Sequence, residues 1–136
     1  MEREGTTAST GHSFNIDGYE IYIEVTANEK GELVSVKTAP LIPDKSSWIP
    51  TFLDMLECTI NRELCYGIPL ESILRDHLDR LYWPNGQTSD PDIPHASSLE
   101  DYICRYLGSR FIPGFLKKYP AKPMSKTQSI ATMHWR

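Results

Sequence analysis

The stretch YEIYIEVTA, residues 19–27, decides the fold, because apolar and polar side chains alternate along it. Strict alternation predicts a half-buried strand of an antiparallel sheet, since successive side chains of a strand point to opposite faces. The pair Asp17-Gly18 before it is a two-residue turn signal of the type I′ hairpin and predicts a short partner strand at 14–16. Gly31 marks the turn on the other side, and we expect a third strand at Leu33–Thr38 with Val34 and Val36 toward the core.

Three helices are expected after this sheet. Apolar residues at helical spacing predict a first helix that is capped by Ser46 or Ser47 and stops at Gly67. Pro69 begins a second helix, and Ser97-Ser98-Leu99-Glu100 has the form of a capping box before a third. The predicted fold class is therefore α+β, a small antiparallel sheet of about three strands followed by and packed on two to three helices.

The length and composition of the chain limit how many domains it can form. A chain of 136 residues fits one domain, and we expect a disordered segment at 1–12, the folded domain at 13–114 and a basic, proline-broken tail at 115–136. No apolar run approaches the roughly 20 residues of a membrane span, and residues 1–11 lack the apolar core of a signal peptide, so we expect a cytoplasmic protein that does not bind membranes.

Charge is distributed unevenly. Up to Asp101 there are 7 basic and 18 acidic residues, whereas the residues after it include 7 basic and no acidic ones. Either the tail is a solvated basic segment, or it docks on an acidic partner, on nucleic acid or on its own domain. The three tryptophans are not spaced as a stacking platform, so no specific nucleic-acid binding is expected.

The three cysteines predict reduced thiols, because the count is odd and no signal peptide is expected. Cys58 and Cys65 are seven residues apart in the first predicted helix and share one of its faces. Their spacing suits neither a disulfide nor a metal site, and we expect small core residues.

Motifs that would carry chemistry are weak. The sequence has no phosphate-binding glycine loop and no nucleophile elbow. His77, flanked by acidic residues, is either a base or ligand or part of a surface ion-pair face, and a hydrolase using His77 or His95 is the least favoured function. Asp90 and Asp92 suit either a hard cation or simple turns. We predict no enzyme activity, no catalytic residue, no metal and no cofactor.

The long loop at 82–96 is the candidate binding region, since loops held between rigid helices concentrate binding residues. The helix after it offers free backbone N–H groups and the positive end of its dipole to an anion. We predict a binding surface bordered by these residues: Trp83, His95, Ser97, Ser98 and Arg105. In the competing interpretation the loop only wraps the core, and Glu100 caps the helix.

Three segments in order resemble one family. LCYGIPLE (64–71) resembles the pattern L-x-x-G-V-P-L-E, and LYWPNGQTSDPDI (81–93) resembles R-F-E-P-S-G-x-T-x-D-P-x-I. SSLEDYICRYL (97–107) resembles T-S-I-x-D-Y-I-F-R-x-L. These patterns are those of the TSCPD domain, which lies near the C-terminus of cobalamin-dependent (class II) ribonucleotide reductases and also forms short free-standing proteins. The resemblance covers about residues 14–111 and departs from the family at the name-giving cysteine, which would fall at Leu99.

The resemblance implies a fold and a context but no reductase activity. A radical reductase needs a thiyl-radical cysteine, a redox cysteine pair and a cobalamin site inside a large barrel, which so short a chain cannot build. It therefore implies a non-catalytic accessory or regulatory protein that binds a protein partner, with a reductase or another nucleotide-metabolism enzyme as the candidate. The alternative is a protein that binds or sequesters a nucleotide-like small molecule. Open sheet edges also predict a homodimer that pairs sheets or helices.

Overall fold

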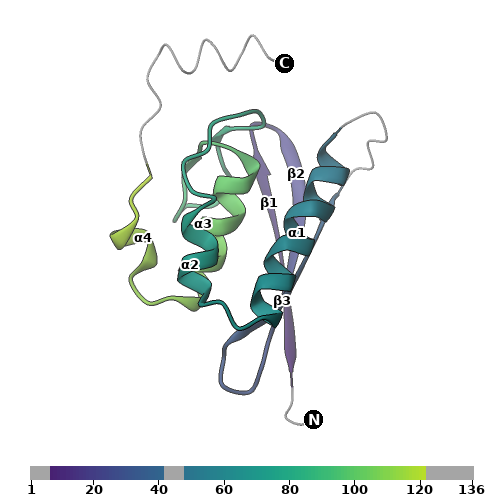
Figure 1. Cartoon of the computed structure of the whole chain (residues 1–136). Helices are drawn as coiled ribbons and strands as arrows, with labels where there is room; N and C mark the ends of the chain where they lie inside the picture. Colours follow the sequence, from purple (N-terminus) through teal and green to yellow (C-terminus); the bar gives the residue numbers. More distant parts are fainter. Residues whose placement is uncertain (1–6, 42–47, 122–136) are drawn as a thin grey trace. The chain divides into compact units, whose positions relative to one another are not determined.

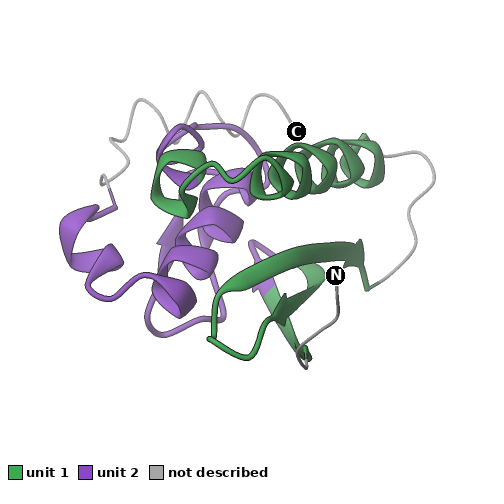
Figure 2. Ribbon diagram, turned by 60° about the horizontal axis from the view of Figure 1, so that its bottom comes forward, with its two compact units in different colours: residues 1–14, 20–73 green, residues 15–19, 74–136 purple. Residues whose placement is uncertain are grey.

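A computed structural model describes residues 7–41 and 48–121 of the chain (Figure 1). The chain divides into two compact units, one of residues 1–14 and 20–73 and one of residues 15–19 and 74–136 (Figure 2). No helix among the described residues is long and apolar enough to cross a membrane.

The first unit is built on a three-stranded antiparallel sheet in the order β1-β2-β3. The strands are β1 (Ala8–Ile16), β2 (Tyr19–Ala27) and β3 (Leu33–Pro40). Asp17 and Gly18 both have positive φ, 50° and 88°, as a type I′ turn requires. With helices following the sheet, the predicted α+β class is confirmed. The expectation of disorder at 1–12 is wrong for Ala8–His12, which continue β1 although their exposed side chains carry no apolar alternation; residues 1–6 lie outside the described part.

A β-bulge changes which side chains of β3 are buried. Thr26 pairs with Ser35 and Ala27 pairs with Leu33, so Val34 is the extra residue between them. The extra residue shifts the alternation by one position, and Leu33 and Val36 are buried while Val34 is 44% exposed. The prediction that Val34 faces the core is therefore wrong.

Helix α1 (Ile49–Cys65) packs on β3, and the two lie alongside one another in Figure 1. It ends as predicted at Gly67, whose φ is +78°. The N–H of Gly67 bonds the carbonyl of Leu64 at 3.0 Å and the N–H of Ile68 bonds that of Glu63 at 3.1 Å, which is a Schellman motif. The N-cap is Trp48, without a side-chain hydrogen bond; the predicted caps Ser46 and Ser47 lie outside the described residues.

Side chains of α1 also bond the outer backbone of β3. The amide of Asn61 donates to the carbonyl of Val36 at 3.0 Å and accepts from its N–H at 2.9 Å. A carboxylate oxygen of Glu57 accepts from the N–H of Thr38 at 3.0 Å. These backbone groups point away from β2, so the helix side chains take the place that another strand would occupy.

Cys58 and Cys65 are exposed, so the prediction of two core cysteines is wrong for both. The buried residues of α1 are Ile49, Leu53, Leu56 and Ile60. At about 100° per residue these lie on the side of the helix opposite Cys58. Cys104, in contrast, is fully buried.

The short helix α2 (Leu70–Arg75) begins in the first unit and ends in the second. It is shorter than the sequence predicts, because apolar residues at helical spacing continue from Leu70 to Leu81. Later in the second unit, the described residues form β4 (Gly86–Gln87), β5 (His95–Ala96), α3 (Leu99–Phe111) and α4 (Phe115–Lys118). Helix α4 packs on α3, and Phe115 is 2% exposed. The predicted tail at 115–136 therefore begins with an ordered, packed helix; residues 122–136 lie outside the described part.

Candidate functional site

The predicted binding loop at 82–96 is tied together by its own polar groups. Gly86 pairs with Ala96 and Gln87 with His95 in a two-stranded ladder. Beyond this ladder the Thr88 hydroxyl donates to the carbonyl of Ile93, and the carboxylate of Asp90 accepts from the N–H of Asp92 at 2.9 Å. This second contact is an Asx-turn, so Asp90 acts as a turn former here.

Asp90 also fastens the loop to α3. The Tyr102 hydroxyl donates to its carboxylate at 2.8 Å. Burial, together with this hydrogen bond to a carboxylate, raises the pKa of the Tyr102 phenol well above its ordinary value, so it stays a donor throughout the accessible pH range. The loop is thus closed on itself by the β4–β5 ladder and tied to α3 through Asp90.

The start of α3 is closed by residues of the unit itself. Ser98 is the N-cap, and its hydroxyl accepts from the N–H of Asp101 at 3.1 Å. The carboxylate of Asp101 in turn accepts from the N–H of Ser97 at 3.0 Å and from that of Asp79 at 2.7 Å. Ser97 and Ser98 are both buried. The carboxylate of Asp101 therefore places a negative charge of the chain itself in the first turn of the helix, where the sequence suggested an external anion.

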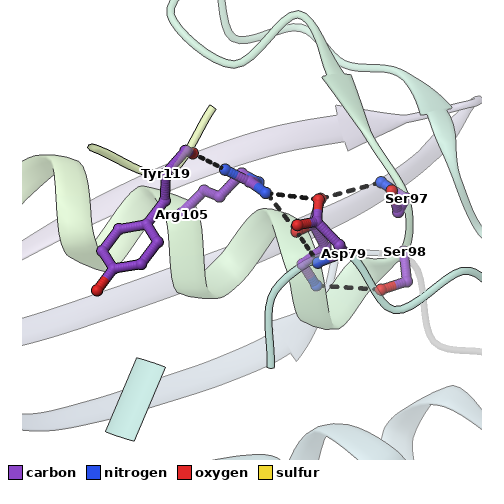
Figure 3. Close-up of polar contacts among 6 residues, drawn as sticks. Asp79, Ser97, Ser98, Arg105 and Tyr119 are labelled. Carbon is purple, nitrogen blue, oxygen red and sulfur yellow. Dashed lines mark hydrogen bonds and ion pairs between the residues drawn. The ribbon is translucent and has the colours of Figure 1, made fainter. Parts of the chain in front are cut away.

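A buried ion cluster extends from Asp101 (Figure 3). Arg105, 1% exposed, donates through Nε to Asp101 at 2.9 Å and through Nη2 to Asp79 at 2.7 Å. Its Nη1 donates to the backbone carbonyl of Tyr119, just after α4. The guanidinium thus joins α3, the segment before the loop and the end of α4. Asp79 reaches it from a left-handed backbone conformation, with φ at 63°.

A second polar group lies one residue earlier on α3. Glu100 accepts from the Tyr82 hydroxyl at 2.7 Å through one carboxylate oxygen and contacts His77 Nδ1 through the other. Burial disfavours the carboxylate, but the hydrogen bonds from His77 and Tyr82 outweigh it and hold the pKa of Glu100 below its ordinary value. Burial and the Glu100 carboxylate raise the pKa of Tyr82 far above its usual range.

A carboxylate that orients a histidine ring is a geometry that general bases also use. Here the side chains of His77 and Glu100 are 19% and 11% exposed. No group of three or more His, Cys, Asp or Glu side chains among the described residues is arranged to hold a metal ion. Burial raises the pKa of the Cys104 thiol well above its ordinary value, which disfavours the nucleophilic thiolate.

The predicted site residues fall into two groups. Ser97, Ser98 and Arg105 come together around Asp101 and are buried. His95 is exposed on β5, and Trp83, half-buried, meets Tyr19 edge-on at 6.1 Å between ring centroids. The structure does not place Trp83 or His95 in the Arg105 cluster, and binding at any of the five residues stays a prediction. The structure adds three residues around Arg105 that were not among the predicted site residues: Asp79, Asp101 and Tyr119.

The comparisons with known proteins relate the chain to one enzyme. It is 32% identical over 109 residues to the vitamin B12-dependent ribonucleotide reductase of Rhodopirellula baltica, a match that covers 80% of this chain and 10% of that protein. It is 31% identical over 101 residues to the enzymes of the same name from Streptomyces avermitilis and Streptantibioticus cattleyicolor, with 74% of this chain covered and 10% and 16% of theirs.

The chain therefore spans between about a tenth and a sixth of the curated relatives it matches. No protein-family model matches it, and no solved structure does. What the comparisons establish is a distant similarity of most of this chain to a small region of B12-dependent ribonucleotide reductases.

Proposed function

We propose that this protein is a non-catalytic accessory or regulatory protein that binds a protein partner, a ribonucleotide reductase or another enzyme of nucleotide metabolism. The main support for this proposal is the extent of the sequence match, in which most of this chain corresponds to about a tenth of the reductase. What the matched region has in common with the reductases is thus a small fold and its surfaces. We further propose that the matched region is the TSCPD domain, on the three sequence segments that resemble it.

The polar groups of the second unit support binding rather than catalysis. Asp79, Asp101 and Arg105 are bonded to one another, and Glu100 is held by His77 and Tyr82. Groups that satisfy each other in this way stabilise the unit and are costly to redirect toward a substrate. A protein partner, in contrast, needs only the exposed surface that these clusters hold in place.

The test uses the full purified chain and the purified ribonucleotide reductase of the source cell. We expect a complex with a dissociation constant in the micromolar range or tighter by biolayer interferometry, and a change in reductase turnover when the chain is added. The double variant Trp83→Ala, His95→Ala tests whether the loop at 82–96 contributes to binding of the reductase. Circular dichroism checks that this variant is folded.

Two results would overturn the proposal. Reduction of a ribonucleotide by the chain alone would make it an enzyme. A nucleotide retained in a native mass spectrum of protein purified from cells, with no measurable binding to the reductase, would favour the small-molecule alternative instead.

A further inference from the structure

The outward face of α1 carries large apolar side chains that are exposed. Tyr66 at its C-cap is 78% exposed, Met55 is 64% exposed and Trp48 at its N-cap is 45% exposed. Cys58 and Arg62 are exposed between them. All five lie on the side of the helix that faces away from β3, since the side chains that pack on the sheet occupy the opposite side. Large apolar side chains exposed on one side of a helix, here interrupted by Arg62, are found at interaction surfaces.

A second copy of the chain is less able to pair with the β3 edge of the sheet. The side chain of Asn61 bonds both backbone groups of Val36, and that of Glu57 bonds the N–H of Thr38. An added strand at β3 would have to displace these helix side chains before it could form its own ladder. The sequence left pairing by sheets or by helices open, and these contacts count against a sheet extended at β3.

Two exposed residues of opposite charge flank Cys58 on α1, about 40° around the helix on either side of it. Asp54 and Arg62 stand four residues before and four residues after Cys58, and both are exposed. Eight residues of helix separate them by about 12 Å along the axis, too far to pair with each other. When two such helices run antiparallel with their Cys58 residues opposed, Asp54 of each copy faces Arg62 of the other, so that the pair forms twice.

We propose that α1 is the surface on which two copies of this chain associate, with their α1 helices antiparallel about a two-fold axis that passes beside Cys58. Packed helices lie about 8–10 Å apart and carry their Cα atoms about 2.3 Å from the axis, so the two Cys58 Cα atoms come within about 3.5–5.5 Å. This range overlaps the separations at which a disulfide forms. One helix pair about 25 Å long is a small interface, so the dimer dissociates in the micromolar range.

Charge reversal tests the arrangement by sedimentation velocity of the full chain in reducing buffer. Asp54→Arg places an Arg opposite an Arg twice and weakens the dimer about tenfold, as does Arg62→Asp with two opposed acids. The double variant Asp54→Arg, Arg62→Asp restores both pairs and returns the dissociation constant to within about threefold of wild type. Lys30→Asp, which makes the same change of charge as Arg62→Asp but in the exposed β2–β3 turn, leaves the dimer unchanged.

Disulfide cross-linking tests whether the two-fold axis of the dimer passes beside Cys58. Diamide accepts two electrons and two protons from two opposed thiols, which become a disulfide. Wild type and Cys65→Ser form a covalent dimer, and Cys58→Ser does not, because the two Cys65 residues would lie about 21 Å apart along the paired helices. A chain that stays monomeric at 500 µM overturns the proposal. So does a dimer that cross-links equally well without Cys58, or one that the double charge reversal fails to restore. The assays use this chain alone, so they do not depend on the proposed partner enzyme.

Discussion

Replacing Gly108 of α3 by alanine tests how α4 is held on α3. A Cβ built on Gly108 would lie 2.2, 2.4 and 2.5 Å from the Cδ2, Cε2 and Cγ atoms of Phe115. These distances are far below van der Waals contact, and the ring is only 2% exposed, so it has little room to move aside. In an ordinary helix interior the same substitution would stabilise the fold by about 1 kcal/mol, because alanine is the better helix former. Overpacking of this kind costs about 1–3 kcal/mol.

The overpacking cost less the gain in helix propensity leaves a loss of up to about 2 kcal/mol, so we expect Gly108→Ala to lower the free energy of unfolding by up to that amount, measured by urea denaturation with circular dichroism. The matched comparison is the same substitution in a Phe115→Ala background. There the ring is gone, and Gly108→Ala should raise stability by about 1 kcal/mol through helix propensity alone. The sign is thus predicted to reverse between the two backgrounds. If Gly108→Ala stabilises the protein with Phe115 in place, the packing of α4 on α3 described above is wrong.

Three further outcomes follow from the structure. Leu56→Ala, at a position on α1 that is 6% exposed, should cost about 2–5 kcal/mol of unfolding free energy, and a loss under about 1 kcal/mol would contradict the assigned buried face. Folding lowers the pKa of Glu100, so its carboxylate stabilises the fold at pH values above its ordinary pKa of 4.5, and this contribution is lost as the pH falls through the lowered pKa. Glu100→Gln should therefore make the free energy of unfolding depend less steeply on pH in this acid range, and an unchanged pH dependence would contradict the assignment. Trp83→Ala with His95→Ala should weaken partner binding per folded molecule if the loop is a binding surface, whereas a sharp fall in melting temperature with unchanged binding would make the loop structural.

Local signals in the sequence located most of the fold. The pair Asp17-Gly18 predicts a turn with two positive φ angles, and Gly67 predicts the end of α1, because few other residues tolerate those conformations. The bulge at Val34 could not be predicted, since it depends on how β2 and β3 pair rather than on the composition of β3. The strand at Ala8–His12 was missed for a similar reason: hydrogen bonds to β2 stabilise it although its own side chains have no strand pattern.

The cysteines and the ion cluster differ in how much the sequence could have shown. A helical projection places Cys58 opposite Leu53, Leu56 and Ile60, so its exposure could have been predicted from spacing alone. The spacing of Asp101 and Arg105, four residues apart on one helix, is likewise visible in the sequence. Asp79 and the carbonyl of Tyr119 are not, because they reach Arg105 from segments 26 and 14 residues away. Contacts at such distances require the tertiary fold.

The start of α3 explains why a sequence pattern for ligand binding can also serve the fold. A helix N-terminus attracts negative charge, and Asp101 supplies that charge from within the same unit. An external anion would have to compete with a carboxylate that is fully buried, accepts two backbone N–H groups and is paired with Arg105. Removing a partner from such a buried network is costly, because each remaining charge or N–H group loses its bond without gaining water. A nucleotide that bound at Ser97 and Ser98 would therefore have to rearrange this cluster. A protein partner could use His95 and the loop surface while the cluster stays intact, and for this reason the protein-binding function is the one we propose.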